Sequence, residues 1–156
     1  MMVVGLWTPK KELNPVVHEL RLRRASGGEL VQVDGSPHQW FENRGPACTL
    51  LVYIDDATGK LLHLEFAESE TTNAYFRATR QYLEHHGKPL AFYVDRHGVF
   101  RVNTTKALTA RVEDSNGKTQ FGRAMDELGI ELIFANSPEA KGRVEKVNQT
   151  LQDRLV

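Results

Sequence analysis

The feature that most restricts the fold is an apolar run, Leu90-Ala91-Phe92-Tyr93-Val94, which follows a Gly/Pro breaker and ends on Asp95. An unbroken run of this kind predicts a strand that is covered on both faces. An earlier run, Leu30-Val31-Gln32-Val33, also ends on an acid, Asp34. Open α/β sheets bind their ligands at the carboxyl edge of parallel strands, where neighbouring strands lie roughly 4.8 Å apart. The two carboxylates are therefore predicted to lie close enough to share metal ions.

The size and charge of the chain restrict its class. Its 156 residues are typical of one domain, and its 20 basic and 20 acidic residues cancel, so charge alone does not indicate a nucleic-acid-binding protein. The single cysteine, Cys48, excludes an internal disulfide and is typical of a reducing cytoplasm. No apolar run has the length of a membrane span, so no membrane partner is expected.

Two regions are distinguished by pattern. Residues 1–28 are predicted to be a connector from an upstream region, either a basic arm that contacts phosphate or a solvated helix. Residues 29–156 are predicted to form the folded domain. Its last helical pattern still continues at Arg154-Leu155-Val156, so we expect this domain to be truncated at its C-terminus.

Within the domain, the patterns predict an alternation of strands and helices. Strands are expected at 30–34, 48–54, 60–66, 90–95 and 130–135. Helices are expected between a cap at Ser69 or Thr71 and a stop at Gly87, at 121–128, and from 140 onward. In the strand at 60–66, Leu62, Leu64 and Phe66 alternate with polar residues and are expected to face the core. Asp55 and Asp56 lie in the turn before it, where a turn-forming role is favoured over a catalytic one. Residues 98–118 lack a period and are expected to form an exposed excursion.

Three motifs carry a family resemblance. They are Val31-Gln32-Val33-Asp34-Gly35, then Tyr93-Val94-Asp95-Arg96-His97-Gly98, and finally the run from Ser137 to Asn148, which contains Pro138, Gly142 and Glu145. Together with the order of the elements, these motifs resemble the catalytic core of DDE transposases and retroviral integrases. Their amino-acid sequence is similar to that of the ISNCY group of bacterial insertion-sequence transposases. The resemblance covers about residues 20–156. It implies an α/β ribonuclease H-like fold, a mixed five-stranded sheet flanked by helices.

The resemblance also implies a chemistry. Asp34, Asp95 and Glu145 would be the catalytic, metal-binding acids, holding two Mg²⁺ or Mn²⁺ ions. Carboxylates that converge repel one another, and hard divalent cations relieve this repulsion. Two ions about 3.5–4 Å apart activate a hydroxyl and stabilise the leaving oxygen of a phosphodiester. The implied activity is DNA strand cleavage followed by strand transfer. It would be carried out by a homo-oligomer that acts on transposon ends and target DNA. The implied location is the bacterial cytoplasm, in association with the nucleoid.

Polar residues around Glu145 are candidates for DNA contact: Lys141, Arg143, Lys146, Asn148, Gln149 and Gln152. For the three basic residues, a solvated helix start is an equal alternative. Two other functions stay open, a ribonuclease H-like nuclease and a catalytically inactive transposase remnant that binds DNA or oligomerises. For the third acid, Glu145 is preferred to Glu139, because a position inside the helix holds a metal ligand more rigidly.

Overall fold

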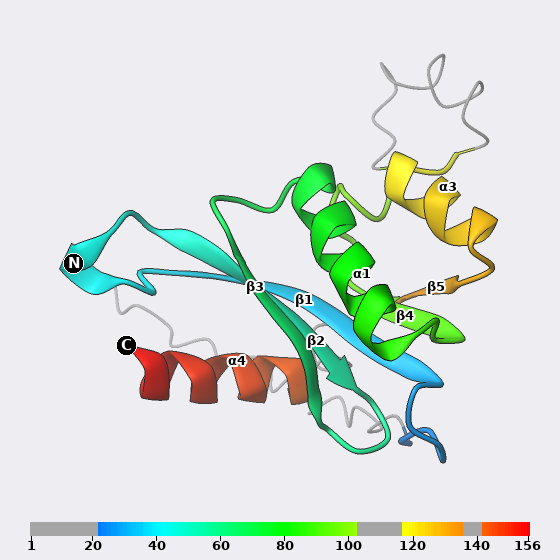
Figure 1. Cartoon of the computed structure of the whole chain (residues 1–156), viewed down its shortest axis with the longest axis horizontal. Coiled ribbons are helices and arrows are strands. Elements are labelled where there is room, and N and C mark those ends of the chain that lie inside the picture. The colour runs from blue at the N-terminus through cyan, green and yellow to red at the C-terminus, as the bar shows by residue number, and fades with distance from the viewer. Residues whose placement is uncertain (1–21, 103–116, 136–141) are drawn as a thin grey trace, which may run out of the picture.

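The structure is a computed structural model that describes residues 22–102, 117–135 and 142–156, except for the side chain of Arg143. One five-stranded sheet has the order β3-β2-β1-β4-β5. Strands β1, β2 and β3 are antiparallel neighbours, and β4 and β5 are added in parallel. Helices α1 and α3 lie on one side of this sheet and α4 on the other (Figure 1). The predicted mixed sheet flanked by helices is confirmed.

The elements are β1 (Leu30–His38), the 3-10 turn η1 (Glu42–Arg44), β2 (Cys48–Asp55), β3 (Leu61–Ala67), α1 (Thr72–His86), β4 (Ala91–Val94), α3 (Gln120–Glu127), β5 (Glu131–Phe134) and α4 (Gly142–Leu155).

Successive side chains of the central strands point to opposite faces of the sheet, and apolar side chains on both faces form two apolar layers. In β2, Leu51 and Tyr53 face α1, whereas Leu50 and Val52 pack with α4. Because helices cover both faces, β2 is buried along almost its whole length. Helix α1 begins where the Thr71 hydroxyl accepts a hydrogen bond from the Ala74 N–H at 3.2 Å, an N-cap of the expected kind. It ends at Gly87, whose φ of 78° favours glycine.

The predicted strand at 90–95 is β4, which lies between β1 and β5 with all four residues buried. Its start differs by one residue from the prediction, since Leu90 is 69% exposed and precedes the strand. The double coverage explains why its sequence is continuously apolar rather than alternating.

The first strand is longer than predicted, because β1 continues through Gly35, Ser36 and Pro37 to His38. Its pairing with β4 is parallel and ends at Gln32 and Tyr93, whereas its pairing with β2 continues to His38 and Cys48. Asp34 therefore lies inside β1, just past the end of the parallel pairing, and the prediction that the strand ends at Asp34 was wrong. Pro37 is tolerated there because a proline has no backbone N–H to donate, and this part of β1 has no neighbouring strand on its β4 side within the described residues.

The orientation predicted for β3 is only partly correct, since Leu62 packs against the core under α1 but the other two apolar residues do not. Leu64 and Phe66 are 40% and 42% exposed, whereas His63 and Glu65 are half-buried against α1. Tyr53 of β2 packs on the His63 ring with centroids 5.7 Å apart, and Arg77 of α1 forms an ion pair with Glu65. The alternation identified the strand correctly, but the helix covers the polar side of this edge strand.

The expected exposed excursion at 98–118 is partly corrected. Val99 and Phe100 are buried, and Phe100 packs edge-on against Tyr75 and Phe121. Residues 103–116 lie outside the described part, as do 1–21 of the predicted connector and 136–141, which include Glu139 and Lys141. Among the described residues, no helix combines the length and apolar character needed to cross a bilayer.

Candidate active site

Asp34 occupies the point at which β1 loses its parallel neighbour. Its side chain is half-buried on the face of the sheet that packs against α4, because its partner in β2 is Val52 of that apolar layer. One carboxylate oxygen, Oδ2, accepts a hydrogen bond of 2.9 Å from the side-chain amide of Asn148 on α4. The contact joins residues that are 114 positions apart in the sequence.

Asp95 directly follows β4, the parallel neighbour of β1. The parallel pairing of the two strands ends at Gln32 and Tyr93, so Asp34 and Asp95 each lie two residues beyond the last paired position. The Asp95 Oδ1 atom accepts a hydrogen bond of 2.9 Å from the backbone N–H of His97, which fixes the turn after the strand. The sheet therefore brings these two predicted acids to the same edge.

Helix α4 carries the third predicted acid, but the three acids do not form one cluster. Glu145 lies in the first turn and is exposed. Asn148, three residues later and on the same helix face, is the residue that contacts Asp34. Within the described residues, no three His, Cys, Asp or Glu side chains converge closely enough to hold one metal ion. Asp34 and Asp95 thus follow the ends of the same parallel pairing, and Glu145 is exposed one helical turn before the residue that contacts Asp34.

The residues predicted to contact DNA fall into three groups. Lys141 and the side chain of Arg143 are outside the described part of the chain. Lys146 and Gln149 are exposed. The two other amides are engaged within the chain, since Asn148 is 8% exposed and bonded to Asp34, and Gln152 donates to the Ser36 hydroxyl at 2.9 Å.

Those two amide contacts hold α4 against β1. They follow Val144 and Val147 of the same helix, of which Val144 is fully buried in the apolar layer with Trp40. Trp40 is itself fixed by its indole N–H, which donates to the Ser36 carbonyl at 2.9 Å. The helix that carries Glu145 is thus attached to the strand that carries Asp34 by both apolar packing and hydrogen bonds.

The donor set at this edge suits a hard divalent cation. Asp34 and Asp95 supply carboxylate oxygens, the ligands preferred by Mg²⁺ and Mn²⁺. The side-chain carbonyl oxygen of Asn148 is buried and has no hydrogen-bond partner among the described residues. An orphaned amide oxygen next to a carboxylate is a further oxygen donor at this position. The residues present therefore fit a metal of this class.

Sequence reasoning missed Glu70, a carboxylate that lies on the other face of β1 from Asp34. It directly precedes the N-cap residue Thr71 and lies against the backbone of Gly35, the neighbour of Asp34. The hydroxyl of the buried Tyr75 donates to Glu70 Oε2 at 2.9 Å. In the sequence, an acid next to a helix start is explained by the helix dipole alone, so no signal distinguished Glu70 from its exposed neighbour Glu68.

Asp55 and Asp56 lie at the opposite end of β1 and bind the chain's own backbone. The Asp55 carboxylate accepts hydrogen bonds from the N–H groups of Gly28 and Thr58, each at 2.8 Å, and from the Thr58 hydroxyl. Asp56 accepts from the Arg24 N–H at 2.9 Å and from the Gln32 amide at 2.7 Å. Burial raises the pKa of Asp55, but the hydrogen bonds that Asp55 accepts from Thr58 and Gly28 outweigh the effect of burial and lower its pKa overall. Asp55 is a turn former, as the sequence favoured, whereas the Asp56 carboxylate joins the turn to β1 and to the segment before it.

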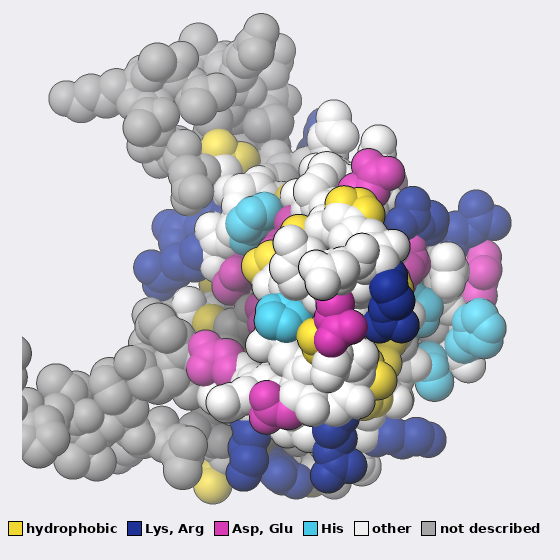
Figure 2. All heavy atoms as spheres, turned by 90° about the vertical axis from the view of Figure 1, so that its left-hand side faces the viewer, with side chains coloured by type: hydrophobic (Ala, Val, Ile, Leu, Met, Phe, Trp, Pro, Cys, Tyr) yellow, Lys and Arg dark blue, Asp and Glu magenta, His cyan; other side chains and the backbone are white. Residues whose placement is uncertain are grey.

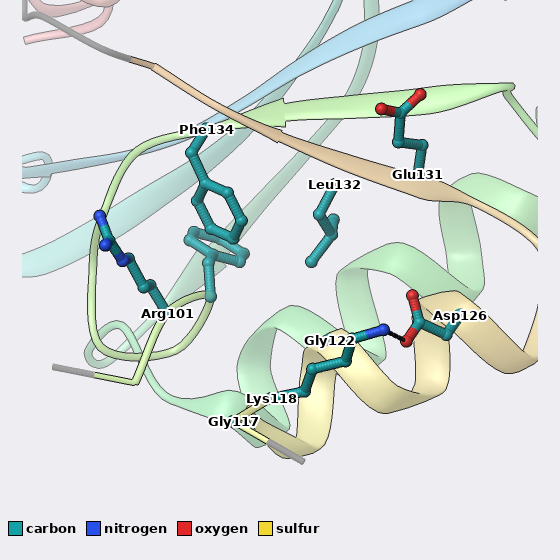
Figure 3. Close-up of a pocket in the computed structure, with 9 residues that line it drawn as sticks. Arg101, Gly117, Lys118, Gly122, Asp126, Glu131, Leu132 and Phe134 are labelled. Atoms are coloured by element: carbon teal, nitrogen blue, oxygen red, sulfur yellow. Dashed lines mark hydrogen bonds and ion pairs between the residues drawn. The ribbon is translucent and has the colours of Figure 1, made fainter. Parts of the chain in front are cut away.

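A separate pocket of about 350 Å³ lies between α3, β5 and the segment after β4 (Figure 3). Phe100 and Phe134 form its apolar wall, and Arg101 lies at one side. Lys118 points across the pocket mouth to an ion pair with Asp126. The pocket lies on the α1 side of the sheet, whereas Asn148 contacts Asp34 on the α4 side. It is not part of the acidic edge.

Comparison with known proteins identifies relatives of the whole chain. No family model matches it. It is 54% identical over 156 residues to a putative transposase of Sinorhizobium fredii, covering 100% of this chain and 33% of that protein. It is 45% identical over 148 residues to the transposase for an insertion sequence of Streptococcus pneumoniae, covering 94% and 30%. The chain thus spans about a third of the length of these relatives.

Solved structures identify the fold. A chain of the simian T-cell lymphotropic virus intasome, solved in complex with PP2A regulatory subunit B56 gamma, superposes with a TM-score of 0.64 at 19% identity, covering 86% of this chain and 42% of that chain. The HTLV-2 integrase catalytic core domain, solved with magnesium, gives a TM-score of 0.57 at 17% identity, covering 81% and 69%. The chain is therefore a homologue of insertion-sequence transposases over about a third of their length, with the ribonuclease H-like fold of retroviral integrase catalytic cores.

Proposed function

We propose that the chain is the catalytic core of a DDE transposase that cleaves DNA strands and joins the freed 3′-hydroxyl to target DNA. The observation that carries this proposal is the placement of Asp34 and Asp95 at one sheet edge in a chain with 54% identity to a transposase. A homo-oligomer bound to transposon ends and target DNA is part of the proposal, as is a location at the bacterial nucleoid.

In this proposal, Asp34, Asp95 and Glu145 hold Mg²⁺ or Mn²⁺. The bound cations supply charge stabilisation at the attacking and leaving oxygens of the phosphodiester. Asp34 is held by the Asn148 amide, and Asp95 by the His97 backbone N–H, so both carboxylates are oriented before any substrate arrives. Glu145 is exposed, so its participation requires the first turn of α4 to approach the other two acids.

The exposed side chains at the start of α4 are proposed to contact DNA backbone phosphates, with Lys146 and Gln149 as the described members. Lys141 and Arg143 are included by their position in the sequence. Asn148 and Gln152 are proposed to serve this surface by holding the helix, since both amides already bond to β1.

The test is a pair of reactions with supercoiled plasmid and Mn²⁺, one for nicking and one for joining a 3′-hydroxyl oligonucleotide. The transposase containing this chain is compared with its Asp34→Asn, Asp95→Asn and Glu145→Gln variants. Each substitution should abolish both reactions, because it removes a negative charge from the metal site while the side chain keeps its shape. Glu139→Gln and Glu127→Gln are the matched controls and should keep most activity. An active Glu145→Gln with an inactive Glu139→Gln would reassign the third acid.

Two rival functions are separated by the same assays. A ribonuclease H-like nuclease would nick but never join. An inactive remnant that binds DNA or oligomerises is favoured by one observation, that the three acids do not converge within the described residues. A remnant would show no nicking and no response to Mn²⁺ in a thermal melt, whereas the proposed enzyme shows both.

A further inference from the structure

The carboxylate of Glu70 lies directly on the backbone of β1. A Cβ atom added to Gly35 would be 2.4 Å from the Glu70 Cδ atom and 2.6 Å from each of its carboxylate oxygens. Real Cβ atoms do not approach other atoms so closely, so a side chain at position 35 would displace the Glu70 carboxylate from its present place.

A buried tyrosine fixes that carboxylate. Tyr75 is fully buried in α1, and its hydroxyl donates to Glu70 Oε2 at 2.9 Å. Burial, together with the negative charges of Glu70 and Asp34, raises the pKa of Tyr75, so the phenol stays protonated and remains a donor.

The two carboxylates flank one strand from opposite sides. Gly35 is paired with Leu51, which belongs to the apolar layer under α1, whereas Asp34 is paired with Val52 of the layer under α4. Glu70 thus covers the α1 side of β1, and Asp34 projects on the α4 side. Between them lies the part of β1 that has passed the end of β4.

Helix capping does not account for Glu70. The N-cap function of α1 is already filled by the Thr71 hydroxyl. Glu70 is half-buried, and no Lys, Arg or His of the described residues forms an ion pair with it. A half-buried carboxylate with only a neutral donor, beside another carboxylate, is stabilised when a cation is near.

We propose that Glu70 increases the affinity of the Asp34–Asp95 edge for a divalent cation, as a fixed negative charge held on the α1 side of β1 by Tyr75 and by the absence of a side chain at Gly35. The inference rests on the proposed function for its metal site. It adds to that site a positioning residue that binds no substrate and is not one of the three predicted acids.

The first test compares Glu70→Gln with Glu68→Gln, a matched control at an exposed position two residues earlier. The glutamine keeps its shape and still accepts the Tyr75 hydrogen bond, so only the charge is removed. Mn²⁺ binding is measured by calorimetry, and the melting temperature is measured in EDTA. Glu70→Gln should weaken Mn²⁺ binding by about tenfold or more with an unchanged melting temperature in EDTA. Equal Mn²⁺ affinity in Glu70→Gln and wild type would overturn the proposal.

The second test uses the glycine. Gly35→Ala should displace the carboxylate, and therefore both weaken Mn²⁺ binding and lower the melting temperature. The double variant Gly35→Ala with Glu70→Ala removes the clash, so the melting temperature in EDTA should recover while Mn²⁺ binding stays weak. Recovery of wild-type Mn²⁺ affinity in the double variant would show that Glu70 contributes only to packing.

These outcomes are distinguishable from failure of the proposed function. If the wild-type protein nicks DNA and Glu70→Gln binds Mn²⁺ normally, only the role of Glu70 is lost. If Mn²⁺ binding depends on Glu70 but the wild type never nicks or joins DNA, the metal site stands and the transposase activity does not. If the wild type binds no Mn²⁺, both fall.

Discussion

Asp55 is the residue whose ionisation contributes most clearly to the stability of the fold. Its carboxylate closes the β2–β3 turn through Thr58 and ties Gly28 to that turn. Because these bonds favour the charged form, the pKa of Asp55 is lower in the folded than in the unfolded chain. The resulting stability is complete above the ordinary carboxyl pKa of about 3.9. It is lost as the pH falls through the lowered value.

Asp55→Asn should therefore lower the free energy of unfolding at neutral pH by about 2 kcal/mol, the usual worth of hydrogen bonds to a charged group. The difference from wild type should begin to shrink as the pH falls below the ordinary carboxyl pKa, and it should continue to shrink toward the lowered pKa of Asp55, because the wild-type carboxyl becomes neutral over this range. Urea unfolding at pH 7 and at about pH 3 measures both values. Asp153→Asn, an exposed position on α4, serves as the control. A difference that does not depend on pH would contradict this account.

At the residue scale, the sequence predicted where Asp34 and Asp95 lie along their strands better than it predicted which side chains contact them. The adjacency of Asp34 and Asp95 follows from two apolar runs that end on acids and from the geometry of parallel strands, both of which are local properties. The contacts of Asn148 and Glu70 depend on where two helices dock. No sequence period encodes that docking, so Asn148 was predicted to face DNA and Glu70 was not singled out.

At the scale of elements, α4 is held by a few contacts that can be removed one at a time. Asn148→Ala should destabilise the fold by about 2 kcal/mol, because Asp34 loses a charge-assisted hydrogen bond. Gln149→Ala, at the exposed neighbouring position, should change the stability by less than about 0.5 kcal/mol. Urea unfolding of the two variants at neutral pH gives the comparison. Equal stability of both variants would mean that this contact does not hold the helix.

The elements also show why one face was assigned wrongly. In β3, the alternation of apolar and polar residues defines two sides but not which of them a helix covers. The covered side carries His63 and Glu65 because Arg77 of α1 pairs with Glu65. The apolar side, with Leu64 and Phe66, is left half open at the sheet edge. In β4, where both sides are covered, no such ambiguity exists, and the prediction held to within one residue.

At the scale of the whole molecule, the charge distribution predicts weak DNA binding. The net charge is zero, and acidic and basic side chains are interspersed on the face shown in Figure 2 rather than gathered into one basic patch. The isolated chain should therefore bind duplex DNA without sequence preference, and raising NaCl from about 50 to 200 mM should abolish the binding. Fluorescence anisotropy with two unrelated duplexes measures this. Tight binding to one sequence at the higher salt would contradict it.

The metal site predicts a response of the entire fold. Mn²⁺ that binds only the native state should stabilise it by about 2.7 kcal/mol at a hundredfold excess over the dissociation constant. A thermal melt with and without Mn²⁺ detects the shift. Asp95→Asn should melt like wild type in EDTA and lose the gain with Mn²⁺. An equal response of the variant would place the bound ion elsewhere.

The distance along the chain between Asp34 and Asn148 has a consequence for the order of folding. The strands β1, β2 and β3 pair through short connections, so they can associate early, because closing a short loop loses little entropy. The contact from α4 to β1 spans 114 positions and requires nearly the whole domain to be in place. Asp34 therefore acquires its amide partner last. A partly folded chain with a formed sheet therefore lacks the bond that orients Asp34, whereas the His97 N–H that orients Asp95 lies only two residues away and can bond early.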